Sequence, residues 1–325
     1  MKRALSLLLT VIMAVALTAC SAETPGASET PGASETPKAT ATPDTSATPG
    51  AAATATPEAT PKPTATPIAV PDEPVKTSPV ANRENFNVSG GFLKGEFVVD
   101  GMVHYRIYVP NDYTDDKAYP MIMYFCEHSG LGTDNKSQLD GIELLFQDPQ
   151  SPAFDCIVVA PQVPDSWFDF YDVPCGKLFD YVTQRYNIDS QRRYVIGIEN
   201  GCFTAWKMVL EFPNMVSAYV NIHGPGPTFY VDGSGNSVDA IMALIDPVPE
   251  AAKDIPMYFF LGKDVPGQMA YYGSWIEYAL PEIGGFTNIT VEEITGYAED
   301  TEKHWASKTD THIIDWLFAQ KRQTK

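Results

Sequence analysis

Glu199 stands at the position whose local pattern best suits chemistry. A run of β-branched and aromatic residues at 193–198 precedes it, and an amphipathic helical pattern follows from Phe203. Gly197 and Gly201 lie two residues to either side, where glycine permits a tight turn between strand and helix. The turn would hold residue 199 at a helix amino terminus, where the helix dipole favours a carboxylate. We therefore expect an ionised Glu199 that either faces a cleft or caps its own helix.

Three histidines, like Glu199, come after a predicted strand. His128, His223 and His304 each follow a predicted strand, and ligands of open α/β sheets bind at the carboxyl ends of strands. With Glu199 they form a set of side chains that could hold a divalent transition metal. No two of them have the spacing of metal ligands on a helix, so separate, hydrogen-bonded histidines are the alternative. We expect no cofactor.

The elements that must position these residues alternate between strand and helix. Continuous apolar runs predict strands buried on both faces, and apolar stripes predict helices between them. The strands are expected at 120–125, 156–160, 193–198, 216–222, 256–262 and 289–295, and the helices at 139–146, 178–186, 203–210, 268–280 and 305–320. This alternation predicts a parallel sheet covered on both faces by helices. Asp100-Gly101 separates two alternating runs and predicts an antiparallel hairpin ahead of that sheet.

The amino terminus has the pattern of an export signal. Met1-Lys2-Arg3 precedes an apolar run at 4–17 that is too short to span a membrane. The following Leu17-Thr18-Ala19-Cys20 resembles the lipobox of bacterial lipoproteins. The resemblance implies cleavage after residue 19 and a lipid on Cys20, which would anchor the protein to the outer face of the cell membrane. An ordinary signal peptide with a chance cysteine is the alternative.

Residues 20–83 are predicted to be a disordered tether. They are rich in Pro, Thr, Ala and Ser, and Glu-Thr-Pro-Gly-Ala-Ser occurs twice in succession. Such a segment cannot bury enough apolar surface to offset its conformational entropy. Residues 84–325 remain for one large domain. The net charge of −19 argues against nucleic acid as a partner.

Four cysteines besides Cys20 remain in the mature chain. Oxidation outside the cell allows three pairings of them, and buried thiols are the alternative. They are Cys126, Cys156, Cys175 and Cys202.

Three stretches together resemble one family. They are Gly132-Thr-Asp-Asn135 with Gln138-Leu139, then Val158-Val-Ala-Pro-Gln162, and Tyr194 to Trp206. They resemble secreted esterases related to polyhydroxybutyrate depolymerases and to feruloyl or acetylxylan esterases, over about residues 90–322. The resemblance implies an α/β-hydrolase fold, with a mostly parallel sheet, flanking helices and an antiparallel N-terminal hairpin. The turn at 197–201 resembles the nucleophile elbow Gly-x-Ser-x-Gly, with Glu199 in place of serine.

The resemblance also assigns the remaining site positions. The family's His-Gly-x-Gly loop, which helps to bind the oxyanion, is Cys126-Glu127-His128-Ser129 here, and a backbone donor could survive at Asn200. Asp264 takes the position of the catalytic acid. Glu302 takes that of the histidine, and His304 lies two residues further on. Trp167 and Phe168, together with His128, His223 and Glu302, are expected to line the cleft.

These replacements favour binding over catalysis. The charge of Glu199 would occupy the place of a developing oxyanion, and Glu127 would add a second charge nearby. A carboxylate is also a poor nucleophile towards an ester, because it is a better leaving group than the alkoxide. We therefore expect a non-hydrolytic, lipid-anchored extracellular protein that binds a carbohydrate or phenolic ligand. The alternative is an active hydrolase that uses Glu199 and His304, with or without a metal.

Overall fold

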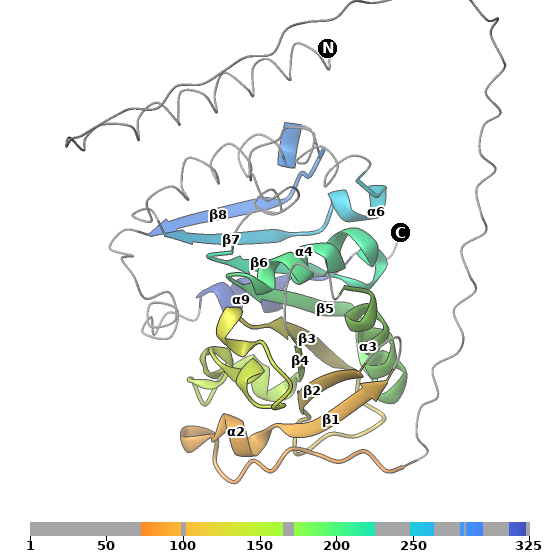
Figure 1. Ribbon diagram of the computed structural model, residues 1–325, viewed down its shortest axis with the longest axis vertical. Helices are drawn as coiled ribbons and strands as arrows, with labels where there is room; N and C mark the ends of the chain where they lie inside the picture. The colour runs from red at the N-terminus through yellow and green to blue at the C-terminus, as the bar shows by residue number, and fades with distance from the viewer. Residues whose placement is uncertain are drawn as a thin grey trace, which may run out of the picture.

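The computed structural model describes residues 73–98, 102–164, 172–224, 248–262, 280–282, 284–294 and 312–322. Within these ranges eight strands form one sheet in the order β1-β2-β4-β3-β5-β6-β7-β8 (Figure 1). The strands are β1 (Leu93–Val98), β2 (Met102–Tyr108), β3 (Tyr119–Phe125), β4 (Ile157–Gln162), β5 (Ile188–Ile198), β6 (Ala218–Ile222), β7 (Met257–Gly262) and β8 (Ile289–Ile294). The described α-helices are α2 (Val88–Gly91), α3 (Asp172–Arg185), α4 (Gly201–Glu211), α6 (Glu250–Lys253) and α9 (His312–Ala319).

The strand directions confirm the predicted sheet. β1 pairs antiparallel with β2, which pairs antiparallel with β4. The other neighbouring pairs, from β4 to β8, are parallel. The hairpin at the start of the sheet is therefore present, while its turn at 99–101 lies outside the described residues. β5 starts earlier than predicted. Residues 189–192 are polar and mostly half-buried, so the apolar run that predicted the strand covers only its second half.

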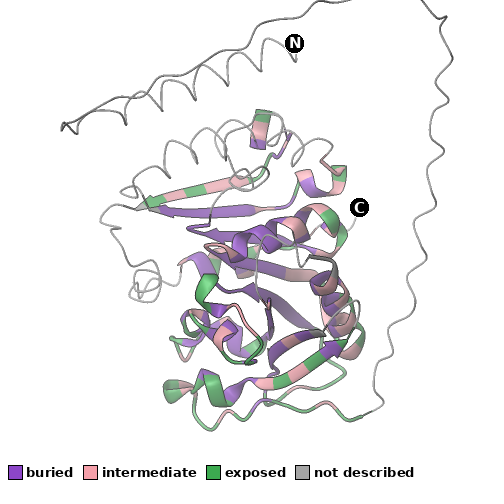
Figure 2. Cartoon of the chain, viewed as in Figure 1, coloured by how far each residue is buried: buried purple, intermediate pink, exposed green. Residues whose placement is uncertain are grey.

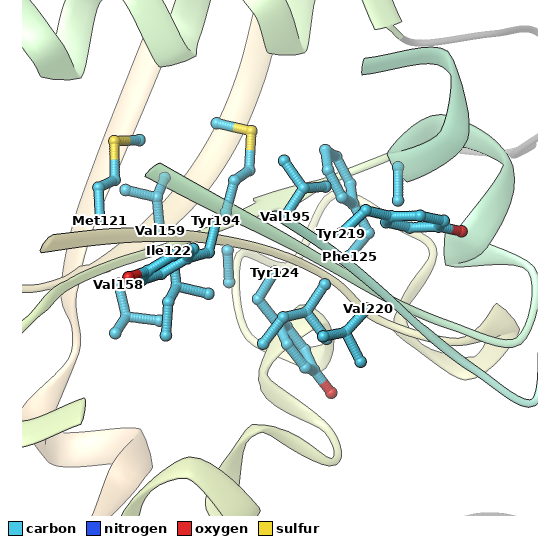
Figure 3. Close-up of a cluster of buried hydrophobic side chains, with 14 of the residues drawn as sticks. Met121, Ile122, Tyr124, Phe125, Val158, Val159, Tyr194, Val195, Tyr219 and Val220 are labelled. Atoms are coloured by element: carbon cyan, nitrogen blue, oxygen red, sulfur yellow. The ribbon is translucent and has the colours of Figure 1, made fainter. Parts of the chain in front are cut away.

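The central strands are buried because both faces of the sheet are covered. Every residue of β3, β4 and β6 is buried (Figure 2). Successive side chains of a strand point to opposite faces, as Val158 and Val159 do in Figure 3. In β5, Tyr194 contacts Phe318 of α9, and a Cβ at Gly197 would touch α4. The helices α4 and α9 therefore cover opposite faces.

The prediction of a helix at 139–146 is wrong. The segment forms two short 3₁₀ turns, η3 (Ser137–Leu139) and η4 (Ile142–Phe146). Gly141 separates them with φ of 79°, a left-handed conformation that no continuous α-helix contains. A Cβ at Gly141 would also lie 2.7 Å from the Tyr124 hydroxyl. Phe146, one of the apolar residues that suggested a helical face, packs instead against the rings of Phe86, Phe92, Tyr108 and Phe154.

The predicted C-terminal helices are only partly described. α9 begins at His312, within the predicted range 305–320, while residues 305–311 lie outside the described residues. Of the predicted helix 268–280, only Leu280 is described. No helix in the described ranges is long and apolar enough to cross a membrane.

The N-terminal segment reaches the domain before Glu84. Ser78 donates its backbone N–H to Val109 at 2.9 Å, and its hydroxyl accepts from the Val109 N–H at 2.9 Å. The Arg185 guanidinium donates to the carbonyl of Glu73. Residues that the sequence analysis assigned to the end of the tether thus contact the folded domain.

Candidate functional site

The turn around Glu199 has the strand-to-helix geometry that the glycine spacing predicts. β5 ends at Ile198, and α4 begins at Gly201. Glu199 has φ of 45°, which is uncommon for a residue with a side chain. Its N–H donates to the Ile222 carbonyl at 2.9 Å, and its carbonyl accepts from the Cys202 N–H at 3.0 Å. These two bonds hold the strained backbone between the end of β6 and the first turn of α4.

Both flanking glycines are required by close contacts. A Cβ at Gly197 would lie 2.6 Å from the Cα of Cys202, so strand and helix could not approach so closely. A Cβ at Gly201 would lie 2.3 Å from the carbonyl oxygen of Cys126 and 2.5 Å from that of Phe125. The amino terminus of α4 is therefore pressed against the end of β3, and residues 126–127 lie next to the turn.

Glu199 is half-buried at the amino terminus of α4. Asn200, the N-cap residue, makes no side-chain hydrogen bond to the first turn. The first N–H groups of a helix have no partner within it, and together with the helix dipole they favour an anion. The turn therefore places Glu199 at the amino terminus of a helix, as the sequence predicts.

The loop after β3 contains the predicted oxyanion region. Cys126 is fully buried, Glu127 is 8% exposed, and His128 is exposed in the short turn η2 (His128–Gly130). A Cβ at Gly130 would lie 2.1 Å from the Cys126 sulfur, so this thiol packs under the turn. Burial is the main cause that raises the pKa of the Cys126 thiol, which makes the thiolate, and hence nucleophilic chemistry, unfavourable.

The other three cysteines are also structural. Cys156, Cys175 and Cys202 are buried, and none of the four cysteines in the described ranges forms a disulfide. The alternative of buried thiols is thus what the structure has. Burial raises the pKa of Cys202 as well, although it lies in the first turn of α4.

A buried polar network fixes the loop that follows η2. The Gln162 side chain accepts from the Asn135 N–H at 2.7 Å and donates to Asp134 at 2.7 Å and to the Gly130 carbonyl at 3.3 Å. Gln138 donates to the Asn135 side chain at 2.7 Å. Residues of two of the three stretches that carried the family resemblance thus contact one another. The sequence contained them all, but it did not reveal that the end of β4 holds this loop.

His223 lies directly beside the turn. It follows β6, has φ of 52°, is 5% exposed and donates its N–H to the Phe260 carbonyl at 2.8 Å. Burial lowers the pKa of the His223 imidazole to about 4, so the ring is neutral at physiological pH. No group of three or more metal-binding side chains occurs in the described part of the chain, although His304 of the predicted metal set lies outside it.

The pKa of His223 predicts a loss of stability in acid. An unfolded histidine has a pKa of about 6.5, so unfolding takes up a proton as the pH falls from there towards 4. We expect this group to contribute about 3 kcal/mol at pH 7 that is lost by pH 4. His223→Asn, a residue that tolerates positive φ, should therefore narrow the difference in unfolding free energy between pH 7 and pH 4.5. Urea titrations at both pH values measure it.

The matched control for this measurement is His128→Asn, because His128 is exposed. It should leave the pH dependence as in the wild type. An unchanged pH dependence in His223→Asn would contradict the assignment of a buried neutral imidazole.

Several predicted site residues lie outside the described residues. They are Cys20, Asp264, His304, Glu302, Trp167 and Phe168. Their predicted roles stay predictions. Of the predicted site, the structure brings Glu199, Asn200, Cys126, Glu127 and His223 together, and it leaves His128 at the surface nearby.

The strand order, the antiparallel hairpin and the strained turn after β5 define an α/β-hydrolase fold. Solved structures agree. A thermostable esterase superimposes with a TM-score of 0.58 at 24% identity, over 72% of this chain and 64% of the esterase, so the match spans just under two thirds of that protein. An S-formylglutathione hydrolase from Agrobacterium tumefaciens gives 0.53 at 14% identity, over 72% and 96% of the two chains.

A feruloyl esterase module from Clostridium thermocellum, complexed with sinapinate, gives a TM-score of 0.51 at 16% identity, over 76% of this chain and 95% of the module. The structural neighbours are thus esterases and related hydrolases. At these identities the likeness establishes the fold alone. No family model matches the sequence, and no curated protein does.

Proposed function

We propose that this protein is a lipid-anchored extracellular protein that uses an esterase-like domain to bind a carbohydrate or phenolic ligand without hydrolysing it. The observation that carries the proposal is the carboxylate at the left-handed turn after β5. Glu199 has φ of 45° and lies at the amino terminus of α4. An acyl transfer at this position must stabilise a new negative charge, and a resident carboxylate opposes it.

The neighbouring loop supports the same conclusion. Glu127 takes the position of a glycine in the family's oxyanion loop and is buried beside the turn. Negative charges on Glu127 and Glu199 would both repel an oxyanion that develops nearby. Nucleophilic attack by the nearby thiols is also unfavourable, because burial raises the pKa of Cys126 and Cys202.

The course of the N-terminal segment is consistent with a tethered protein. Glu73 contacts Arg185, just before β5 begins, whereas Glu199 follows the end of β5. A strand of 11 residues is roughly 35 Å long at about 3.3 Å per residue. Glu73, the first residue that the structure describes, therefore contacts the domain at the end of β5 that is opposite to Glu199.

An active hydrolase is the second candidate, and two observations favour it. The backbone at Glu199 is strained, with φ of 45°. Such a conformation costs about 1–3 kcal/mol and occurs mainly at functional sites. The structural neighbours are also named as esterases and hydrolases. In this candidate Glu199 acts with His304, with or without a metal.

A panel of esters separates the two candidates. The wild type, Glu199→Ser and Glu199→Ala would each be assayed with acetyl, feruloyl and short-chain nitrophenyl esters. We expect no turnover above the uncatalysed rate by the wild type. We also expect little gain in Glu199→Ser, because the loop that helps to bind the oxyanion in the family is altered too, with Glu127 in place of a glycine.

Turnover by the wild type that disappears in Glu199→Ala would contradict the binding function and establish the hydrolase. Strong activity gained by Glu199→Ser alone would show that the oxyanion region is still competent. Circular dichroism of the three proteins controls for folding.

A further inference from the structure

The chain before α2 is attached to the domain at separate points. Residues 73–87, which we term the strap, are mostly exposed, but Ser78 is 1% exposed and makes its two hydrogen bonds to Val109. The Arg83 guanidinium donates to Asp155 at 3.1 Å, and because both side chains are partly exposed this ion pair contributes little. A segment held by so few bonds can detach from the domain while the sheet stays folded.

Phe86 connects the strap to an aromatic cluster. The centroid of its ring lies 5.0 Å from that of Phe146, 5.4 Å from that of Phe154 and 5.6 Å from that of Tyr108. Tyr108 belongs to β2, whereas Phe146 ends η4 and Phe154 lies in the 3₁₀ turn η5 (Pro152–Asp155). Ring pairs at these separations are stabilising. The strap therefore supports two turns that lie between β3 and β4.

The chain between β3 and β4 depends on such support. Its regular elements are the 3₁₀ turns η2, η3, η4 and η5, without an α-helix among them. Turns of this kind are short and have poorer hydrogen-bond geometry than an α-helix. Contacts with other parts of the molecule therefore keep them in place, and they loosen before the strands do when a packing partner is removed.

The other end of η4 contacts the candidate site. A Cβ at Gly141, directly before η4, would lie 2.7 Å from the Tyr124 hydroxyl and 3.5 Å from the side chain of Ile198, the last residue before the strained turn. The Asp140 carbonyl accepts from the Tyr124 hydroxyl at 2.7 Å, and the Asp140 side chain accepts from the Ser129 hydroxyl in η2 at 3.4 Å. A continuous series of contacts thus joins the strap, through η4, to both parts of the candidate site.

We propose that the strap is a conformational switch for the candidate site. While it is docked, Ser78 and Phe86 hold η4, and η4 holds the loop at 126–132 against the turn after β5. When the strap is detached, η4 and this loop loosen while the rest of the sheet stays folded. The strap follows the predicted tether directly, so in the lipid-anchored protein of the proposed function a pull on the tether acts on the strap before the rest of the domain.

Hydrogen exchange followed by mass spectrometry tests the proposal on the full mature chain. Phe86→Ala removes the three ring contacts, and we expect the amides of 137–146 and 126–132 to exchange at least about tenfold faster than in the wild type. The amides of β6 and β7 should exchange as in the wild type. Phe86→Leu keeps part of the apolar contact and should give a smaller increase in the same two segments.

A second strap variant and a matched control separate the switch from a general loss of stability. Ser78→Ala removes the acceptor of the Val109 N–H without altering the aromatic cluster, and it should raise exchange in the same two segments. It carries the test if Phe86→Ala does not fold. Phe318→Ala removes another half-buried ring, which packs on Tyr194 from α9. It should leave exchange at 126–132 and 137–146 unchanged.

Unchanged exchange at 137–146 in the folded strap variants would overturn the proposal. So would an equal increase in β6 and β7, because the strap would then stabilise the domain as a whole. An increase at 137–146 that does not extend to 126–132 would also overturn it, since η4 would not transmit the change to the site. Ester hydrolysis by the wild type would contradict the proposed binding function but not the switch, because exchange does not depend on what the site does.

Discussion

Gly201→Ala is expected to lower the free energy of unfolding by about 3 kcal/mol, enough to leave a domain of ordinary stability largely unfolded at elevated temperature. The new Cβ would lie 2.3 Å from the carbonyl oxygen of Cys126, 2.5 Å from that of Phe125 and 2.8 Å from the carbonyl carbon of Phe125. All three are backbone atoms of the central strand β3 and the residue after it. No side-chain rotation relieves the contact, so either α4 or the end of β3 must move.

The same movement would alter the candidate site, because Glu199 and Glu127 lie on the two segments that separate. Urea unfolding followed by circular dichroism measures the change in stability. Gly90→Ala is the matched control, since the nearest atoms to its added Cβ are 3.7 Å away, an ordinary contact. A Gly201→Ala variant within 1 kcal/mol of the wild type would show that β3 and α4 do not approach as closely as the structure has them.

The parts of the fold that the sequence predicts are those with a strong local pattern. The strands β3, β4 and β6 are continuous apolar runs, and both faces of each strand are covered. The turn at Glu199 follows from two glycines at fixed spacing, each required by a close backbone contact. The sequence pattern was sufficient in these places. The turn depends on contacts between residues close together in the sequence, and burial on both faces requires the same apolar pattern in every central strand.

The sequence-based predictions fail where contacts with residues far away in the sequence determine the local structure. Apolar spacing at 139–146 resembles a helix, but Gly141 lies over Tyr124 of β3, and the Phe146 ring packs against Phe86 and Phe154. Tertiary packing overrides the local preference there. Similarly, nothing in the residues around Asn135 shows that Gln162, at the end of β4, holds their loop through three hydrogen bonds.

Gln162→Leu is expected to have the second largest effect on stability, about 3 kcal/mol. Leucine is close to glutamine in size, but it can make none of the three hydrogen bonds that Gln162 makes to Asn135, Asp134 and Gly130. Asn135 is 6% exposed, so water cannot readily replace the lost acceptor for its N–H. A buried polar group left without a partner costs about 1–3 kcal/mol, and the loss of the bonds to Gly130 and Asp134 adds to it.

Two further variants distinguish the network from simple packing. Gln162→Glu keeps an acceptor for the Asn135 N–H but turns a donor towards Asp134 into a second negative charge, so it should destabilise at pH 7 and less so at pH 4, where carboxyls begin to protonate. Gln184→Leu, on the exposed face of α3 with one hydrogen bond to Asp180, should change stability by less than about 0.5 kcal/mol. If Gln162→Leu unfolded at the same urea concentration as Gln184→Leu, the network would contribute nothing. The loop that carries Glu127 would then have to be held by its other contacts, such as the packing of Gly130 on Cys126 and the hydrogen bond from the Gly132 N–H to the Val163 carbonyl.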